Sequence, residues 1–266
     1  MNKDEFYIGY VDDIGVDTKK TVKKFVILAM LVLTVGALLF GFFQKPAVNS
    51  SYDFGNPTKV SGIYHESPYP MLRVSLAENE FKDIVLLGVG KFGPNMYLKE
   101  LRENEGNLNG KHLNIEGQLI YYNGKTLLEI DDSQKVSLAS GNRPMEVLAK
   151  PLGQQKIEGE IIDPKCYFGV MKPGYGKVHR SCASLCIAGG VPPVLVSNNE
   201  NGDENYFLLT DLEGNRINKD ILQYIGQPSI VSGTVSEVGD WKIMKIDVQK
   251  IKKLNRKSLI LSLIHI

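Results

Sequence analysis

Residues 110–131 read "GKHLNIEGQLIYYNGKTLLEID", and residues 226–247 read "GQPSIVSGTVSEVGDWKIMKID". The two stretches align without a gap at an offset of 116 positions, which places Gly117 on Gly233. Each stretch alternates apolar and polar residues on both sides of a turn, a pattern typical of two antiparallel strands. We therefore expect two similar β-hairpins in one chain, and the repetition suggests two copies of one small unit.

The similarity extends upstream of each hairpin. "KVSGIYHES" around Gly62 resembles "KIEGEIIDP" around Gly159, and a helix-compatible stretch ("MYLKELREN" or "NKDILQYI") precedes each hairpin. Three strands, a short helix and two further strands are the element order of an OB-type five-stranded barrel. We predict a mainly β fold with two tandem OB-like barrels, over residues 58–138 and 156–254, separated near residues 139–155.

An uncharged run of 19 residues, "FVILAMLVLTVGALLFGFF", occupies residues 25–43. At about 1.5 Å of rise per residue, a helix of this length matches the ~30 Å hydrocarbon core of a bilayer. The core helix of a water-soluble protein rarely stays apolar on every face over such a length. We therefore predict one transmembrane helix over residues 25–43.

The charges around this helix predict its orientation. Lysines are concentrated before the apolar run and only Lys45 lies close after it, so residues 1–24 form a cytoplasmic tail by the positive-inside rule. The run exceeds a typical signal-peptide core and no small-x-small cleavage site follows, which favours an uncleaved signal anchor. We expect a single-pass protein of the bacterial inner membrane, with residues 44–57 as a linker and the bulk of the chain periplasmic or extracellular. The preceding lysines are Lys19, Lys20, Lys23 and Lys24.

One segment between two expected strands of the second copy holds all three cysteines and one of the four histidines of the chain. It reads "PKCYFGVMKPGYGKVHRSCASLCIAGGV", residues 164–191. His179, Cys182 and Cys186 have the spacing of one helix face, and two glycines end that helix. The segments around Gly62 and Gly159 align at an offset of 97 positions, whereas the hairpins align at 116. Because the two offsets differ by 19 positions, we expect a helical Cys/His insertion in the second barrel. The first copy has no cysteine, so we expect the cysteines to be dispensable to the shared scaffold.

Three chemistries compete for this cluster. Cys166, His179, Cys182 and Cys186 form a Cys₃His set, which suits tetrahedral zinc or Cu(I). Outside the cytoplasm, a disulfide from Cys166 to Cys182 or Cys186 is the plain structural alternative, and it leaves one thiol over. In the third chemistry, thiol–disulfide exchange, His179 and a helix N-terminus would lower the pKa of Cys182. The sequence leaves all three open.

The pattern D-x-x-C-Y followed by H-x-x-C-A-x-x-C-I-x-G-G-x-P-P resembles a family of exported, membrane-anchored bacterial proteins with OB-like domains. The segments "DEFYIGY", "SPYPML" and "VLLGVGKFG" also look like parts of its members. The resemblance implies an architecture and no activity. It rests on Asp163, Cys166, Tyr167, His179, Cys182, Ala183, Cys186, Ile187, Gly189, Gly190, Pro192 and Pro193.

Several functions are disfavoured by the remaining sequence. The formal net charge is +1, so we expect no nucleic-acid partner. "GVGKFG" matches a dinucleotide-binding pattern, but a hairpin and not a βαβ unit follows it. Isolated acids such as Asp163 have the positions of strand-end or turn residues. For Asp163, solvation at the surface is favoured over a role in orienting a ligand.

The predicted function is therefore an envelope accessory or binding protein that binds a metal and serves a redox or metalloprotein system through an envelope protein partner. A thiol–disulfide oxidoreductase and a disulfide-stapled interaction module are the alternatives, and a binding module is favoured over an enzyme. Residues 255–266, which end in "SLIHI", resemble translated sequencing-adapter sequence, and we exclude them from the fold prediction as a candidate foreign tail.

Overall fold

A computed structural model describes most of the chain, and the predicted foreign tail and the first 14 residues lie outside the described part. Two compact units are separated at residue 47, and each is described by itself. The start of the predicted linker also lies outside the described residues. The described residues are 15–43, 49–77, 80–141, 148–199 and 202–254.

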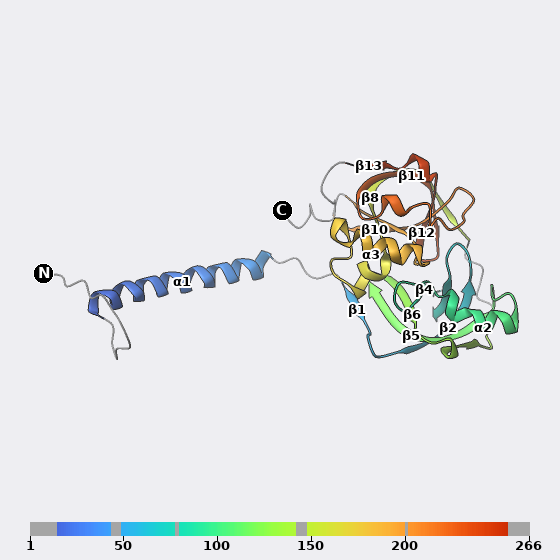
Figure 1. Cartoon of the computed structure of the whole chain (residues 1–266), viewed down its shortest axis with the longest axis horizontal. Coiled ribbons are helices and arrows are strands. Elements are labelled where there is room, and N and C mark those ends of the chain that lie inside the picture. Colours follow the sequence, from blue (N-terminus) through green and yellow to red (C-terminus); the bar gives the residue numbers. More distant parts are fainter. Residues whose placement is uncertain (1–14, 44–48, 78–79, 142–147, 200–201, 255–266) are drawn as a thin grey trace. The chain divides into compact units, whose positions relative to one another are not determined.

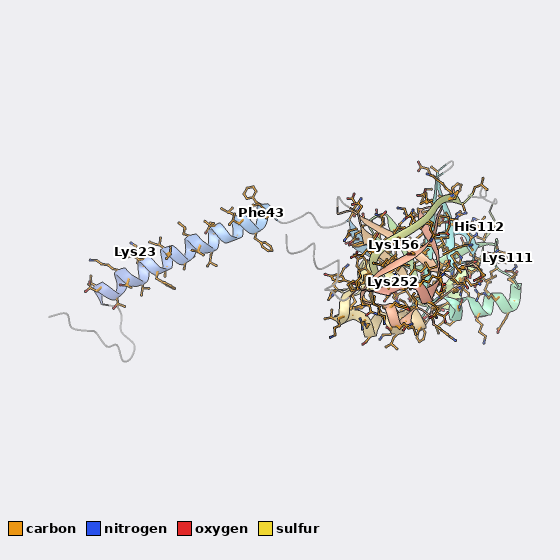
Figure 2. The ribbon with its side chains drawn as sticks, turned by 90° about the horizontal axis from the view of Figure 1, so that it is seen from above. Lys23, Phe43, Lys111, His112, Lys156 and Lys252 are labelled. Carbon is orange, nitrogen blue, oxygen red and sulfur yellow. The ribbon has the colours of Figure 1, made fainter. Side chains whose placement is uncertain are left out.

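The first unit contains helix α1 (Val16–Phe43), which is 28 residues long and has a mean hydropathy of 2.7 over its most apolar window. None of its residues is buried, and side chains such as Lys23 and Phe43 stand away from the helix (Figure 2). A core helix of a soluble protein would be buried, so that interpretation does not apply to α1. The length and composition are compatible with a single membrane span.

The second unit begins with a closed five-stranded barrel (Figure 1). Its strands neighbour one another in the order β5-β2-β3-β4-β6, and β6 returns to β5 to close the ring; β4 and β6 are parallel and the other neighbours antiparallel. Helix α2 (Asn95–Glu105) joins the third strand to the fourth and buries Tyr97 and Leu98. Short strands β1 (Ser50–Tyr52) and β7 (Val136–Leu138) add to β5, and η1 (Ser133–Lys135) precedes β7. The barrel strands are β2 (Thr58–His65), β3 (Met71–Ala77), β4 (Glu80–Gly88), β5 (His112–Tyr122) and β6 (Lys125–Ile130).

A second closed five-stranded barrel follows, with the neighbour order β11-β8-β9-β10-β12 and β12 returning to β11. Here β10 and β12 are the parallel pair. The prediction of a mainly β fold with two small barrels is thus confirmed at this level, although β8 begins at Lys150 and not at residue 156. The elements are β8 (Lys150–Ile162), β9 (Val194–Asn198), β10 (Glu204–Thr210), β11 (Pro228–Val238), β12 (Trp241–Ile246), β13 (Lys252–Lys253), η3 (Leu222–Tyr224) and η4 (Val248–Lys250).

The closing hairpins of the two barrels pair in the same register. Gln118 lies opposite Glu129 in the first, and the residues 116 positions later, Thr234 and Lys245, lie opposite each other in the second. The glycine before each of these positions is required by a close approach of the facing strand. A Cβ on Gly117 would lie 2.4 Å from the Glu129 carbonyl oxygen, and the equivalent contact in the second hairpin is 2.2 Å. The aligned glycines therefore permit the same close strand pairing in both barrels.

The barrels differ most in the connection between their first two strands. Residues 163–193 join β8 to β9 and are 26 residues longer than residues 66–70, which join β2 to β3. The longer connection contains η2 (Cys166–Val170) and α3 (Gly176–Ala188), and α3 buries two side chains, at positions 183 and 187, in the second barrel core. The prediction of a helix at "NKDILQYI" is wrong, because the chain there forms only the three-residue 3-10 helix η3, which packs against α3. The segment between β8 and β9 therefore contributes to the second barrel core through the two side chains of α3, while its cysteines lie outside that core cluster.

A third apolar core lies between the barrels. It joins the outer faces of the two barrels and includes the aromatic residues of η2. The Tyr69 hydroxyl donates to the Leu209 carbonyl oxygen at 2.7 Å, and the Trp241 indole N–H donates to the Asp83 carbonyl oxygen at 3.0 Å. The two barrels consequently form one body. This inter-barrel core contains Tyr69, Met71, Val85, Leu87, Ile120, Tyr122, Leu127, Ile162, Tyr167, Phe168, Cys186, Val191, Val194, Val196, Tyr206, Leu208 and Trp241.

Candidate metal centre

The turn after β8 directs Cys166 into the protein. Asp163 begins this turn: its side-chain Oδ1 accepts the Lys165 backbone N–H at 2.9 Å, and its carbonyl oxygen accepts the Tyr167 N–H at 3.0 Å. Such side-chain-to-backbone bonds are typical of aspartate at a turn. They use one carboxylate oxygen and leave Oδ2 for other contacts. Cys166 follows as a buried residue, 4% exposed.

Helix α3 carries the other three predicted ligands, and both of its ends are fixed. The buried Glu160 carboxylate accepts the backbone N–H of Gly176, the first helical residue, where the free N–H groups and the helix dipole favour an acid. At the other end, the Asn218 side-chain amide donates to the carbonyl oxygens of Ile187 and Val191 at 2.7 and 2.8 Å. The predicted helix, ended by Gly189, is confirmed.

The structure brings all four predicted ligands together, as two overlapping sets of three donors. In the first set, Cys166, His179 and Cys182 offer ligand atoms within 4.8 Å of one another. In the second set, Asp163, Cys166 and Cys186 do the same. Cys166 belongs to both sets and therefore lies at the middle of the cluster. Only Cys182 is partly exposed; the other donors are buried.

Two buried polar atoms in the cluster are without a hydrogen-bond partner among the described residues. These are Oδ2 of Asp163, whose residue is 0% exposed, and Nε2 of His179, whose residue is 4% exposed. The two atoms lie 4.0 Å apart, which is too long for a hydrogen bond. A buried polar atom without a partner costs about 1–3 kcal/mol, so this arrangement needs a compensating group.

The expectation that Asp163 is solvated at the surface is wrong. The residue lies at the junction of the two barrels and forms part of the cluster wall. The sequence carried one signal for it, because the aspartate stands three positions before Cys166 at the end of a strand. That spacing alone does not distinguish a buried acid from an exposed turn residue.

Lys165 ties the cluster to the first barrel. Its ammonium is buried and donates to the Gly88 and Gly90 carbonyl oxygens, both at 2.8 Å, and it lies 3.0 Å from the Glu129 carboxylate. Burial of an ammonium requires such partners. The sequence analysis did not single out this lysine, since nothing in a linear pattern reveals acceptors that come from another barrel.

The glycines of "GVGKFG" serve the same contact. The Gly93 N–H donates to the Gly189 carbonyl oxygen at 2.9 Å, at the C-terminal end of α3. A Cβ on Gly189 would lie 1.8 Å from the Lys91 carbonyl oxygen, so only glycine fits. The motif therefore forms part of the packing between the first barrel and α3.

Two of the thiols, Cys166 and Cys182, have raised pKa values. A hydrogen bond with Cys186, burial, and the charge and a hydrogen bond of Asp163 all raise the pKa of Cys166. Burial and Cys186 raise the pKa of Cys182, although the Lys91 ammonium acts in the opposite direction. The lowered pKa of Cys182 that the thiol–disulfide exchange alternative requires is therefore not observed. The three cysteines are free, and a metal ion that binds them displaces protons.

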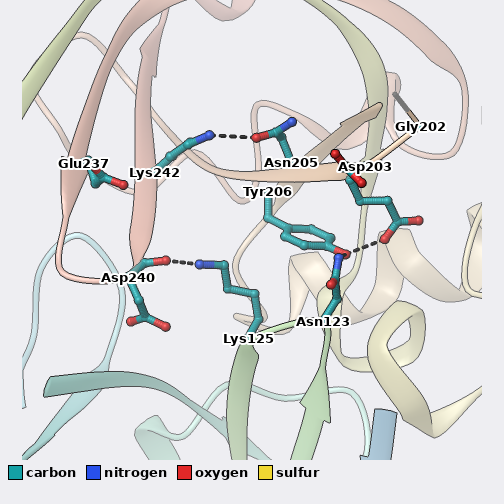
Figure 3. A pocket seen from close by; sticks show the side chains of 10 residues that line it. Asn123, Lys125, Gly202, Asp203, Asn205, Tyr206, Glu237, Asp240 and Lys242 are labelled. Carbon is teal, nitrogen blue, oxygen red and sulfur yellow. Dashed lines mark hydrogen bonds between the residues drawn. The ribbon is translucent and has the colours of Figure 1, made fainter. Parts of the chain in front are cut away.

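A polar pocket of about 510 Å³ lies elsewhere along the junction (Figure 3). Its lysines already have acceptors: Lys125 donates to the Asp240 carbonyl oxygen, and Lys242 donates to the Asn205 side chain at 2.7 Å. The Tyr206 hydroxyl donates to the Glu204 carboxylate. Because the lining groups are paired with one another, the pocket offers weaker support for a ligand site than the Cys/His cluster does.

Comparisons with known proteins do not identify this arrangement of side chains. No protein-family model, no curated protein and no solved structure matches the chain. The case for a function therefore rests on the residues themselves.

Proposed function

We propose that the protein is a membrane-anchored envelope protein whose second barrel binds a metal ion through Cys166, His179, Cys182 and Cys186. The observation that supports this most is the gathering of these side chains into two donor sets that share Cys166. Thiolate and imidazole are the ligands that zinc and copper ions prefer in proteins. The site would bind and hold the ion through these ligands.

The architecture proposed with this function is a pair of OB-like barrels that arose as two copies of one unit. Support comes from the helix between the third and fourth strands of the first barrel and from the matching hairpin registers. We further propose an uncleaved anchor at α1, with residues 1–24 cytoplasmic and the barrels periplasmic or extracellular. The lysines before the apolar run support that orientation.

The role proposed for the site is that of an accessory in a redox or metalloprotein system, acting with an envelope protein partner. The partly exposed Cys182 gives the cluster one side that a partner can approach. The oxidoreductase alternative has less support, because a thiol active in exchange needs a lowered pKa and the pKa of Cys182 is raised. The disulfide-stapled alternative has less support, because all three thiols are free.

Mass spectrometry of the full-length chain in detergent tests the proposal. Under native conditions the protein should carry one zinc or copper ion per chain, and under denaturing conditions it should lose that mass and show three thiols that alkylate. A metal-free protein in which Cys166 is fully engaged in a disulfide would contradict the proposal.

A further inference from the structure

We infer that Asp163 is a ligand of the same ion and that the site consequently selects a divalent ion of the zinc class over Cu(I). This inference rests on the proposed metal-binding function and adds a carboxylate to the four donors named there, so that a tetrahedral ion would bind four of five candidate ligands. Asp163 is fully buried at the end of β8 and shares a donor set with Cys166 and Cys186. The cluster thus combines oxygen, nitrogen and sulfur donors.

The separation between Asp163 and His179 fits two ligands of one ion. Oxygen and nitrogen bonds of about 2.0–2.2 Å in a tetrahedral zinc site place the two ligand atoms about 3.3–3.5 Å apart. The observed distance of 4.0 Å between Asp163 Oδ2 and His179 Nε2 is about 0.5 Å longer, so the two side chains would approach each other when they bind the ion; it is also too long for a hydrogen bond. Both atoms are buried without a partner among the described residues, and one ion would satisfy both.

The backbone of the turn holds the carboxylate in this orientation. Oδ1 accepts the Lys165 N–H at 2.9 Å, so Oδ2 is the oxygen that remains for the ion. Ligating carboxylates in metal sites are commonly oriented by such an additional hydrogen bond. The Lys165 ammonium is itself engaged with Glu129 and two carbonyl oxygens of the first barrel, and no ion pair between it and Asp163 is found among the described residues.

Charge and ligand type both favour a divalent ion. Three thiolates and one carboxylate converge in the cluster, and a divalent ion offsets two of those charges where Cu(I) offsets one. Buried charge without compensation is costly. Carboxylate oxygen is a normal ligand of zinc and a poor one for soft Cu(I), which selects thiolate and thioether.

Metal titrations of the full-length chain in detergent test this inference. The variants are Asp163→Asn and Asp163→Cys, with Asp247→Asn and Asp247→Cys as matched controls, since Asp247 caps η4 away from the cluster. Asp163→Asn should weaken Zn²⁺ binding by at least about 100-fold, the upper end of the loss expected for a residue that acts only through a ligand. The same variant should leave Cu(I) binding within about threefold, and the controls should match the wild type.

The cobalt-loaded protein separates a ligand from a residue that only orients His179. Asp163→Cys should raise the thiolate-to-cobalt charge-transfer absorption by about one third to one half, because it adds one thiolate to two or three. X-ray absorption of the wild-type zinc protein should show two oxygen or nitrogen ligands, and this measurement needs no variant to fold.

The outcomes distinguish this inference from the proposed function. A wild-type chain that binds none of Zn²⁺, Co²⁺ and Cu(I) refutes both, and a chain that binds Cu(I) alone refutes only this inference. A wild-type chain that binds Zn²⁺ and Co²⁺, together with an Asp163→Asn variant of unchanged affinity, refutes only the assignment of Asp163. Weaker binding without any gain in charge-transfer absorption in Asp163→Cys also refutes it, because Asp163 would then act from outside the coordination sphere. An equal loss of Cu(I) affinity refutes the preference for a divalent ion.

Discussion

The short connection at residues 66–70 and the long connection at residues 163–193 occupy the same place in their barrels, yet only the long one carries the candidate site. Each reaches across to the third strand of the other barrel: Tyr69 donates to the Leu209 carbonyl oxygen of β10, and Lys165 donates to the Gly88 carbonyl oxygen of β4. Both therefore join the barrels. The longer one additionally supplies a helix that fills the second barrel core and positions the donor cluster.

The two connections also join the barrels through different kinds of contact. The short connection relies on an ionic contact, in which Glu66 meets Arg216 of the second barrel at 2.7 Å and Arg102 of α2. The long connection relies on apolar packing around Phe168 and on the cluster. The predictions that follow separate these contributions.

The largest expected effect comes from Phe168→Ala. Phe168 is 0% exposed, stacks on Tyr122 with ring centroids 5.4 Å apart, and contacts Tyr206 and Trp241. Removing such a side chain should lower the free energy of unfolding by about 4 kcal/mol. Urea unfolding followed by Trp241 fluorescence and by circular dichroism measures the loss.

If the long connection belongs to a joint core, both signals of Phe168→Ala should shift together. Phe54→Ala is the matched control, because Phe54 is 73% exposed and its loss should change stability by less than about 0.5 kcal/mol. Two separate transitions, with one barrel unaffected, would show that the barrels are independent.

Cys166→Ser should have the next largest effect, because Cys166 is the donor common to both sets. At a free metal concentration about 100 times the Kd, loss of binding removes about 2.7 kcal/mol of stability. Thermal unfolding with added Zn²⁺ measures this difference. A chelator should lower the stability of the wild type to nearly that of the variant. If the wild type remains more stable in the presence of the chelator, Cys166 stabilises the fold by packing and not by binding the ion.

Gly189→Ala should cost about 1–3 kcal/mol, because a new Cβ would collide with the Lys91 carbonyl oxygen and separate α3 from the "GVGKFG" loop. Hydrogen exchange at Gly93 N–H, which donates to Gly189, should quicken in this variant. Ala188→Ser, at an exposed neighbouring position, should behave as the wild type. Unchanged exchange in Gly189→Ala would contradict the role given to the loop.

The smallest expected effect is the pH dependence at Glu66. Burial raises its pKa, but hydrogen bonds from Tyr64 and Arg216 and the charges of Arg102 and Arg216 outweigh burial, so the pKa lies below the usual 4.5. A carboxylate whose pKa is lowered by folding stabilises the fold at pH values above its unfolded-state pKa. This contribution disappears as the pH falls through the folded-state pKa.

Glu66→Gln should therefore be less stable than the wild type at pH 7 by up to about 1 kcal/mol, a limit set by the partial exposure of the ion pairs. The difference should disappear in acid, below the folded-state pKa. Urea midpoints between pH 2.5 and 7 measure it, and a difference that persists unchanged at the lowest pH would contradict the ionic explanation.

The sequence predicted the strands and the helix that holds the ligands because both depend on local patterns. Alternation and glycine positions located the hairpins, and the spacing of His179, Cys182 and Cys186 with a terminal glycine located α3. The helix expected at "NKDILQYI" is only the 3-10 helix η3, and the segment packs Ile221 and Tyr224 into the same core as α3. Such packing against a distant part of the chain is not visible in a local pattern.

The candidate site was predicted in its ligands and not in its surroundings. Asp163 was predicted to be a surface residue and Lys165 was not considered, since the burial of Lys165 depends on the Gly88 and Gly90 carbonyl oxygens of the first barrel, about 75 positions earlier. The raised pKa of Cys182 likewise results from tertiary packing. Such properties are set by long-range contacts that no local pattern encodes.

The most direct test of the central claim is a crystal structure of the metal-loaded protein with anomalous data collected at the zinc absorption edge. The account predicts one anomalous peak within about 2.0–2.3 Å of Cys166 Sγ, His179 Nε2 and Asp163 Oδ2. A map without a peak, in which Cys166 Sγ lies about 2.05 Å from the sulfur of Cys182 or Cys186, would contradict it.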